Sequence, residues 1–509
     1  MNHRSFARST LAPLLLACAA AAATSPQLHA ALHPRAAAAI PEPSGGGLER
    51  ALDSIKTENI RSDIFFIASD ELGGRDTPSL GQRVAARYIR ARMVRLGLKP
   101  GNGESFFHEY PLVSSEVDPQ ATRLTIQAPS GKHELTLGED YFPQPFGFRT
   151  ETLEGRVVFA GKGSREELAQ ADVSGAWALC YESDSSSRQR SRAAREAGAL
   201  GVIAIPEPDH QGEPFDRRSA EALARLRRAG VRYPSPAGEE ASERRNLAQV
   251  SLSGKAAAAV WPALAKADRV PALGTELASA CTDERATAGG GSILVENVCA
   301  FWPGSDPELS KEVILISAHY DHVGTNSRGE IHNGADDNGS GTSGLMALAE
   351  ALAAHGPLRR SVMLIWVSGE EKGLWGSRAW TENPSLPPGH KPLCNINIDM
   401  IGRNAPDKLL ITPTQKLKQY NGLTRLAEKL APLEGFPKLG SCDEYWARSD
   451  QMNFSVHLGI PVAFLFSDIH EDYHRPGDDP EKIDCDKIRR VTRLVMRMLD
   501  GLQADSLEL

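Results

Sequence analysis

The stretch ISAHYDHVG, residues 316–324, ends an apolar run with two histidines and an aspartate. The run from 313 to 317 predicts a buried β-strand, and after a loop, NGADDNGSG (333–341) leads into an apolar stretch that predicts a helix over 342–354. Three further strands are predicted at 362–367, 396–398 and 462–466. Continuous apolar strands that alternate with helices indicate an α/β sheet covered on both faces.

Acidic and imidazole side chains gather where these predicted strands end. Functional groups of open α/β sheets lie at the C-terminal ends of the strands. The candidates at these ends are His319, Asp321, Asp336, Asp337, Glu370, Glu371, Asp399, Asp472 and His474. Histidines together with several carboxylates suit a divalent metal, and the excess of carboxylates favours two ions over one.

Five motifs in this order carry a family resemblance. They are ISAHYDHVG, NGADDNGSG, SGEEKGLWGS (368–377), NIDMIGR (397–403) and DYHRPGDD (472–479). The set closely resembles the co-catalytic zinc exopeptidases of the bacterial leucyl aminopeptidase type, a superfamily that also contains glutamate carboxypeptidase II, glutaminyl cyclases and transferrin receptor. The resemblance covers about 48–115 and 285–509, with ASDELGGR (68–75) included. It implies a three-layer α/β domain around a mixed, mainly parallel sheet.

The same resemblance implies a metal-ligand set. In it, His319 and Asp399 hold one zinc ion, Glu371 and His474 hold the other, and Asp337 bridges the two. Asp337 is preferred to Asp336 because it immediately precedes the NGSG tetrapeptide. Ligand type alone does not distinguish zinc from manganese or cobalt at such a site.

The resemblance also implies roles beside the metals. Glu370 matches the general base, and Asp321 matches the carboxylate that orients His319. Tyr473 is the candidate for a phenol that stabilises the oxyanion. Gln451 stands where family members often carry a histidine, in a segment (448–451) that shapes the substrate pocket. Structural or pocket-lining roles are expected for the additional histidines, which are His322, His332 and His470.

The middle of the chain has a different sequence pattern. Short strand-like runs broken by turns occupy 118–275, at 124–126, 135–137, 157–159, 176–179 and 202–205. GRVVFAGKG (155–163), GAWALCY (175–181) and REAGALGVIAI (195–205) are similar to a protease-associated domain. The predicted organisation is a signal peptide (1–30), a linker (31–47), the first part of the peptidase domain (48–117), a mostly β protease-associated insertion (118–275) and the di-zinc peptidase domain (276–509).

The N-terminus predicts export. Arg4 and Arg8 precede an apolar stretch (11–23) and the sequence LHA at 28–30, the outline of a cleaved secretory signal peptide. Cys18 could alternatively be the lipid-anchored residue of a lipoprotein. No other transmembrane run is predicted, so a periplasmic or secreted location is expected.

Six cysteines follow the signal peptide, at 180, 281, 299, 394, 442 and 485, and none has the spacing of a zinc site. Export permits disulfides between Cys281 and Cys299 or between Cys442 and Cys485, and buried free thiols are the equally weighted alternative.

Composition and motifs together define the functional hypotheses. The 509 residues carry a formal charge of −8, without the basic excess expected of a nucleic-acid binder. The leading hypothesis is an exported zinc aminopeptidase that acts on peptides. A carboxypeptidase would need a basic clamp for the substrate carboxylate, for which Arg403, Arg448 and Arg475 are candidates. A receptor-like binding protein and a glutaminyl cyclase are the remaining alternatives. Oligomeric state is left open.

Overall fold

The computed structural model describes residues 46–118, 122–143, 152–182, 187–207, 215–216, 218–220, 230–234, 247–264, 269–284, 287–326 and 328–509. The predicted signal peptide, nearly all of the linker and Cys18 lie outside these ranges. None of the described helices combines the length and apolar composition that a membrane span requires.

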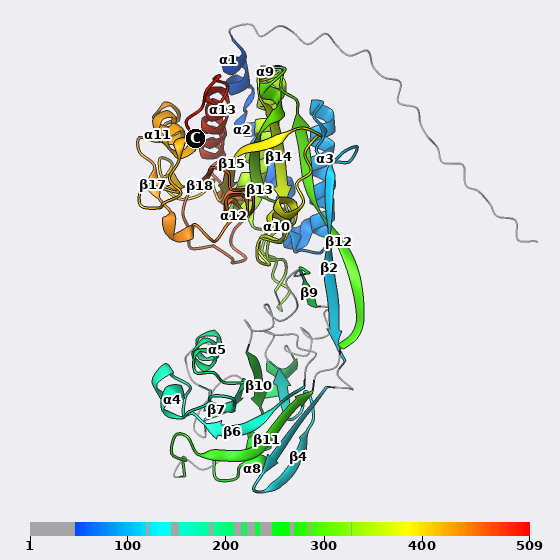
Figure 1. Ribbon diagram of the computed structural model, residues 1–509. Coiled ribbons are helices and arrows are strands. Elements are labelled where there is room, and N and C mark those ends of the chain that lie inside the picture. Colours follow the sequence, from blue (N-terminus) through cyan, green and yellow to red (C-terminus); the bar gives the residue numbers. More distant parts are fainter. Residues whose placement is uncertain are drawn as a thin grey trace, which may run out of the picture. The chain divides into compact units, whose positions relative to one another are not determined.

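The first sheet has ten strands in the order β17-β16-β18-β15-β13-β14-β12-β2-β9, with β1 paired to β12 (Figure 1). The strands β18, β15, β13 and β14 run parallel to one another. Strand β12 runs antiparallel to both of its neighbours, β14 and β2. The mixed, mainly parallel core predicted from the sequence is therefore confirmed. The strand bounds are β1 Lys99–Pro100, β2 Phe107–Val117, β9 Gly230–Arg232, β12 Thr287–Trp302, β13 Glu312–His319, β14 Ser361–Val367, β15 Lys391–Asp399, β16 Leu410–Thr412, β17 Gly440–Ser441 and β18 Val462–Phe466.

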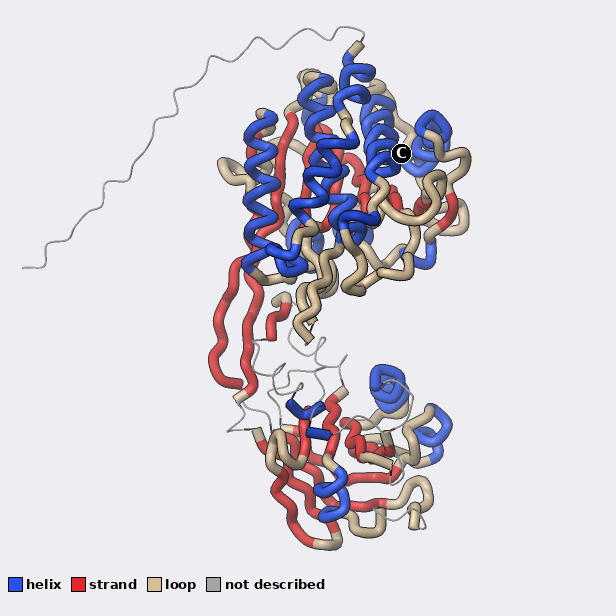
Figure 2. The backbone as a smooth tube through the Cα atoms, turned by 180° about the vertical axis from the view of Figure 1, so that it is seen from behind, coloured by secondary structure: helices blue, strands red, loops and turns tan. Residues whose placement is uncertain are grey.

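Helices cover both faces of this sheet. On one face, α2, α3, α9 and α13 contribute to a core that contains Ile314 and Leu364, and Figure 2 shows this helical layer in front of the strands. On the other face, Leu315 and Ile365 contact Trp380 of α10 and Phe454 of α12 in a second core. Successive strand residues thus point to opposite layers, as the strand period of two requires. The helices are α1 Gly47–Ser54, α2 Thr57–Ile67, α3 Leu80–Leu96, α9 Gly341–His355, α10 Trp375–Glu382, α11 Gly422–Leu430, α12 Gln451–Leu458 and α13 Cys485–Gly501, with short turns η1 Asp70–Arg75, η2 Leu309–Lys311, η3 Ala335–Ser340, η4 Ala431–Glu434, η5 Asp443–Tyr445 and η6 Pro480–Lys482.

Helix α3 shows how local sequence sets an element's ends. The Ser79 side chain accepts a hydrogen bond from the Gln82 backbone N–H at 3.1 Å, which caps the first turn. Gly97 ends the helix at φ 82°, a conformation that glycine adopts without a Cβ penalty. Between these ends Ala85, Ile89 and Met93 are buried at helical spacing.

A second sheet has eight strands in the order β4-β3-β11-β6-β7-β8-β10-β5. The predicted runs at 124–126, 157–159 and 202–205 lie within β3, β6 and β8. β11 also pairs in this sheet, although its residues follow the predicted boundary at 275, and β9, from within 118–275, pairs with β2 in the first sheet. The domain boundaries and the resemblance to a protease-associated domain stay predictions. The elements are β3 Arg123–Ala128, β4 Gly131–Leu135, β5 Tyr141–Pro143, β6 Leu153–Phe159, β7 Trp177–Tyr181, β8 Gly201–Ile205, β10 Ala248–Leu252 and β11 Glu276–Glu284, with helices α4 Arg165–Gln170, α5 Ser187–Glu196 and α8 Gly254–Val260.

The six cysteines of the described residues are all buried free thiols. Cys281 lies on β11 of the second sheet and Cys299 on β12 of the first. Cys442 and Cys485 belong to different hydrophobic cores. The sequence left two alternatives open, disulfides and buried free thiols, and the structure has the free thiols.

Candidate active site

The predicted site residues meet at the C-terminal ends of the parallel strands. His319 is the last residue of β13 and Asp399 is the last of β15. Glu370 and Glu371 lie in the turn after β14, Asp337 lies in η3 directly before α9, and His474 follows β18. Because these strands are parallel neighbours, residues far apart in sequence reach one edge of the sheet.

Three of these side chains form a first cluster around His319. Its Nε2 atom lies 3.2 Å from Asp399 Oδ1 and 3.3 Å from Asp337 Oδ1. Burial alone would lower the pKa of His319, but the carboxylates of Asp399 and Glu370 raise it well above its ordinary value. The cluster therefore offers one imidazole and two carboxylate oxygens to a cation.

A second cluster forms around His474. Its Nε2 atom lies 3.0 Å from Glu371 Oε2 and 3.1 Å from Asp337 Oδ2. Burial would lower the pKa of His474, yet hydrogen bonding and charge from these two carboxylates raise it to about 10. Asp337 thus turns one oxygen to each imidazole, the arrangement expected of a bridging ligand. Both clusters fit a zinc ion in donor type, since imidazole nitrogen and carboxylate oxygen are typical zinc ligands.

Glu370 lies beside the first cluster. One of its carboxylate oxygens is within 4.8 Å of the ligand atoms of His319 and Asp399. Burial, reinforced by the charge of Glu371, raises the pKa of Glu370 well above its ordinary value, against the opposing charge of His319. A carboxylate at this position can reach a water molecule bound between the clusters without being a ligand itself.

Asp321 lies beside His319, and its main chain and carboxylate have different partners. His319 Nδ1 is 3.2 Å from the backbone carbonyl oxygen of Asp321 and 3.7 Å from its carboxylate Oδ1, so the main chain is the nearer acceptor. The carboxylate accepts hydrogen bonds from the Glu370 backbone N–H and the Thr77 hydroxyl, each at 3.2 Å. Asp321 therefore connects the histidine loop to the backbone of Glu370. Thr77 has no signal in the sequence beyond its place after ASDELGGR.

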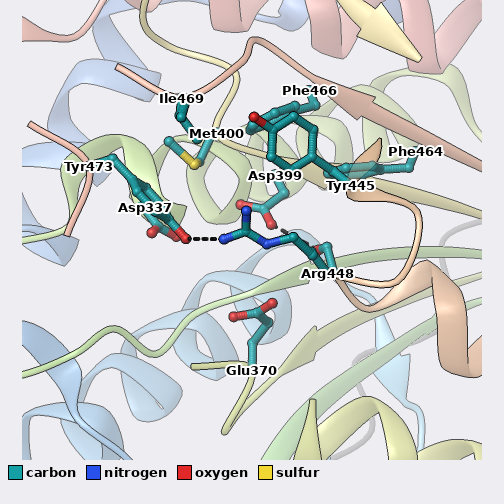
Figure 3. A pocket seen from close by; sticks show the side chains of 11 residues that line it. Asp337, Glu370, Asp399, Met400, Tyr445, Arg448, Phe464, Phe466, Ile469 and Tyr473 are labelled. Atoms are coloured by element: carbon teal, nitrogen blue, oxygen red, sulfur yellow. Dashed lines mark hydrogen bonds between the residues drawn. The ribbon is translucent and has the colours of Figure 1, made fainter. Parts of the chain in front are cut away.

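A pocket opens over these clusters (Figure 3). Tyr473 stacks on His474 with ring centroids 3.9 Å apart, and its hydroxyl accepts a hydrogen bond from Arg448 Nη2 at 3.4 Å. Burial, with the charges of Asp337 and Glu371, raises the pKa of Tyr473, which keeps the phenol protonated. The pocket is lined by Asp337, Glu370, Asp399, Met400, Tyr445, Arg448, Ser449, Phe464, Phe466, Ile469 and Tyr473.

The segment 448–451 contributes more than the sequence indicated. The Ser449 hydroxyl donates to Asp399 Oδ2 at 2.8 Å and so orients a candidate ligand. Gln451 is fully buried, accepts a hydrogen bond from Asn397 Nδ2 at 3.1 Å, and does not line the pocket. Asp450 is also fully buried, and burial raises its pKa to about 7.

The three additional histidines differ from one another. His322 contacts the second cluster, with Nδ1 2.9 Å from Glu371 Oε1. His470 Nε2 lies 3.4 Å from Asp336 Oδ2, and His332 Nε2 lies 3.4 Å from the Asn326 side-chain amide. The sequence indicates that all three lie near the site, but it does not show that His322 alone contacts a candidate ligand among them in this way.

One region of the chain matches a known protein family. Residues 297–499 match the sequence model of peptidase family M28. This region belongs to that family. The M28 region contains every predicted metal ligand.

Relatives of this chain include the probable leucine aminopeptidase of Arthroderma benhamiae, 27% identical over 200 residues, which are 37% of this chain and 54% of that protein. The chain thus spans about half the length of this curated relative.

Among solved structures, the aminopeptidase from Aneurinibacillus sp. strain AM-1 has a TM-score of 0.54 at 21% identity, covering 91% of this chain and 97% of that chain. BSAP, a zinc aminopeptidase from Bacillus subtilis, has a TM-score of 0.54 at 19% identity and covers 89% of this chain and 96% of its own. At this level of identity the similarity establishes a common fold.

Proposed function

We propose that this M28 protein is an exported, zinc-dependent aminopeptidase that removes N-terminal residues from peptides. One observation carries the proposal: the Asp337 carboxylate lies between two imidazoles, with Oδ1 3.3 Å from His319 Nε2 and Oδ2 3.1 Å from His474 Nε2. The relatives and the similar structures, which are aminopeptidases by name, support the reaction class. Export rests on the predicted signal peptide.

Each cluster would hold one metal ion. His319 and Asp399 would bind the first ion, Glu371 and His474 the second, with Asp337 shared. When bound, the ions supply Lewis acidity toward water and toward the carbonyl oxygen of the substrate. Zinc fits the donors, and manganese and cobalt fit them as well.

The protein's own groups would move the protons. Glu370 would take a proton from the attacking water and return it to the leaving amine, since its carboxylate lies beside the ligand atoms of His319 and Asp399. Asp321 fixes the Glu370 backbone through the 3.2 Å hydrogen bond. Tyr473 donates its phenolic hydrogen to the oxyanion, since its pKa is raised and the hydroxyl faces the pocket.

A carboxypeptidase is the second candidate, and Arg448 is the observation that favours it. This arginine lines the pocket, lies 5.3 Å from the Tyr445 ring centroid and forms no ion pair with a carboxylate of the described residues. It could therefore bind a substrate carboxylate. Arg403, by contrast, is paired with Asp472 at 3.0 Å. A receptor-like protein is less well supported, because all five ligand positions and the base position are filled.

The test is hydrolysis of peptides and aminoacyl chromogenic amides with free, N-acetylated or C-terminally blocked ends, with metal content measured on the same sample. We expect cleavage only of substrates with a free amine, about two metal ions per chain, and loss of activity on chelation. Cleavage that tolerates a blocked amine but requires a free carboxylate would support the carboxypeptidase instead. Full metal occupancy without turnover would contradict both.

A further inference from the structure

His322 is a buried imidazole that the proposed mechanism does not use. It lies in the loop after β13, three residues beyond the ligand His319, and none of its side chain is exposed. Its Nδ1 atom lies 2.9 Å from Glu371 Oε1, within hydrogen-bond distance. The next carboxylate oxygen, Asp337 Oδ2, is 3.8 Å away, which is too far for a hydrogen bond.

The two oxygens of Glu371 consequently have different partners. Oε1 faces His322, whereas Oε2 lies 3.0 Å from His474 Nε2 and so belongs to the second cluster. A carboxylate with one oxygen held by an N–H donor presents its other oxygen in a fixed direction. Hydrogen bonds of this kind orient metal ligands in many proteins.

The His322 ring is held in place from several sides. Gly334 passes so close that a Cβ on it would lie 2.4 Å from His322 Cγ, and Gly334 has a φ of 58°. The ring meets the His474 ring edge-on, with centroids 5.6 Å apart. The His322 backbone N–H also donates to the Arg75 carbonyl oxygen at 3.4 Å. These contacts leave the Nδ1 atom directed at Glu371.

The two contacts of Glu371 are compatible with each other, because each uses a different carboxylate oxygen. An ionised carboxylate can accept the Nδ1–H hydrogen bond and still bind a cation through its other oxygen.

We propose that His322 is a positioning residue for the second metal ion: its Nδ1–H group donates to Glu371 Oε1 and leaves Oε2 to bind the metal. The inference rests on the proposed metal sites, although it does not depend on the substrate. It requires a proton on Nδ1 of His322. Loss of such a supporting hydrogen bond typically costs about 10–100-fold in metal affinity or activity, and here the loss should fall on one of the two ions.

The test is a Co²⁺ titration of the metal-free protein, followed by the visible absorption of the bound ions and by calorimetry. We would compare His322→Leu, which removes the donor, with His322→Asn, whose amide nitrogen can donate from near the position of Nδ1. His390→Leu is the matched control, because the His390 ring contacts Phe301 and the Pro388 carbonyl oxygen. Circular dichroism and thermal unfolding would verify that each variant folds.

We expect His322→Leu to bind one ion with unchanged affinity and the other about 10–100-fold more weakly. His322→Asn should restore most of the loss, and His390→Leu should match the wild type. Equal weakening of both ions, no weakening, or an Asn variant as weak as the Leu variant would overturn the proposal. So would a changed absorption spectrum of the saturated Asn variant, which would indicate that His322 binds the metal directly.

The same experiment separates this inference from the proposed function. A wild-type protein that binds fewer than two ions would contradict the ligand set and therefore both proposals. Two ions bound with the expected response to His322 substitution, but no peptide hydrolysis, would contradict only the aminopeptidase.

Discussion

Hydrogen bonds that support the candidate site come from residues whose roles the motifs do not indicate. The ligands themselves could be predicted, because each stands at the end of a predicted strand and within a family motif. Ser449, Thr77 and His322 could not, because their contacts depend on how loops from separate elements fold over the sheet edge. Asp321 illustrates the same limit of local sequence: the motif predicts its place beside His319, but its carboxylate is directed to Glu370 and Thr77.

Ser449→Ala tests the support of Asp399. The substitution removes the 2.8 Å hydrogen bond to Asp399 Oδ2 without adding bulk. We expect about 10–100-fold weaker metal binding or activity, as for other groups that orient metal ligands. Ser455→Ala, on the following helix α12, is the control, since no hydrogen bond of its hydroxyl occurs among the described residues. Equal effects of the two substitutions, in hydrolysis and in metal titration, would contradict this role.

Among elements, the turn η1 anchors the site through one buried arginine. Arg75 donates hydrogen bonds to the carbonyl oxygens of Ile67, Tyr320, Asn333 and Gly334, at 2.6–2.9 Å. It therefore connects the end of α2 with the loops that carry His322 and Asp337.

The sequence predicted that ASDELGGR belongs to the catalytic domain but not that the side chain of its arginine is buried. Helix α3 was predictable because its cap, its apolar spacing and its terminal glycine are local signals. The sheet to which β9 or β11 belongs was not, because it depends on pairing with strands that are distant in sequence.

Arg75→Ala tests this anchor. Four carbonyl groups would lose a charged donor in a buried setting, where each unsatisfied group costs about 1–3 kcal/mol. We expect the free energy of unfolding, measured by urea titration, to fall by roughly 3 kcal/mol or more. Arg83→Ala, on the exposed side of α3, should leave it nearly unchanged. An Arg75→Ala protein as stable as the wild type would show that the anchor is unnecessary.

At the scale of the whole molecule, two sheets each enclose their own hydrophobic cores, and the six described cysteines are distributed among those cores. The sequence predicted the alternating strands and helices of the first sheet, but cysteine connectivity depends on which core each residue joins. Burial raises the pKa of Cys180, Cys299 and Cys394 to about 12, which disfavours the reactive thiolate.

These six thiols should be unreactive in the folded protein. We expect iodoacetamide at pH 8 to label none of them in the native state and all of them in denaturant, measured by peptide mass mapping. The peptide that contains Cys18 is excluded from the comparison. Disulfide-linked peptides that join Cys281 to Cys299, or Cys442 to Cys485, would contradict the structure.

The central claim is that two metal ions and one carboxylate base share this site, and Glu370→Gln tests it most directly. The variant, the wild type and Glu371→Gln would be measured together for metal content and for hydrolysis of an aminoacyl amide. We predict that Glu370→Gln keeps about two ions per chain and loses about 10²–10⁴-fold in kcat, since it removes a base but no ligand. Glu371→Gln should lose one ion. Normal hydrolysis by Glu370→Gln with both ions bound would contradict the account.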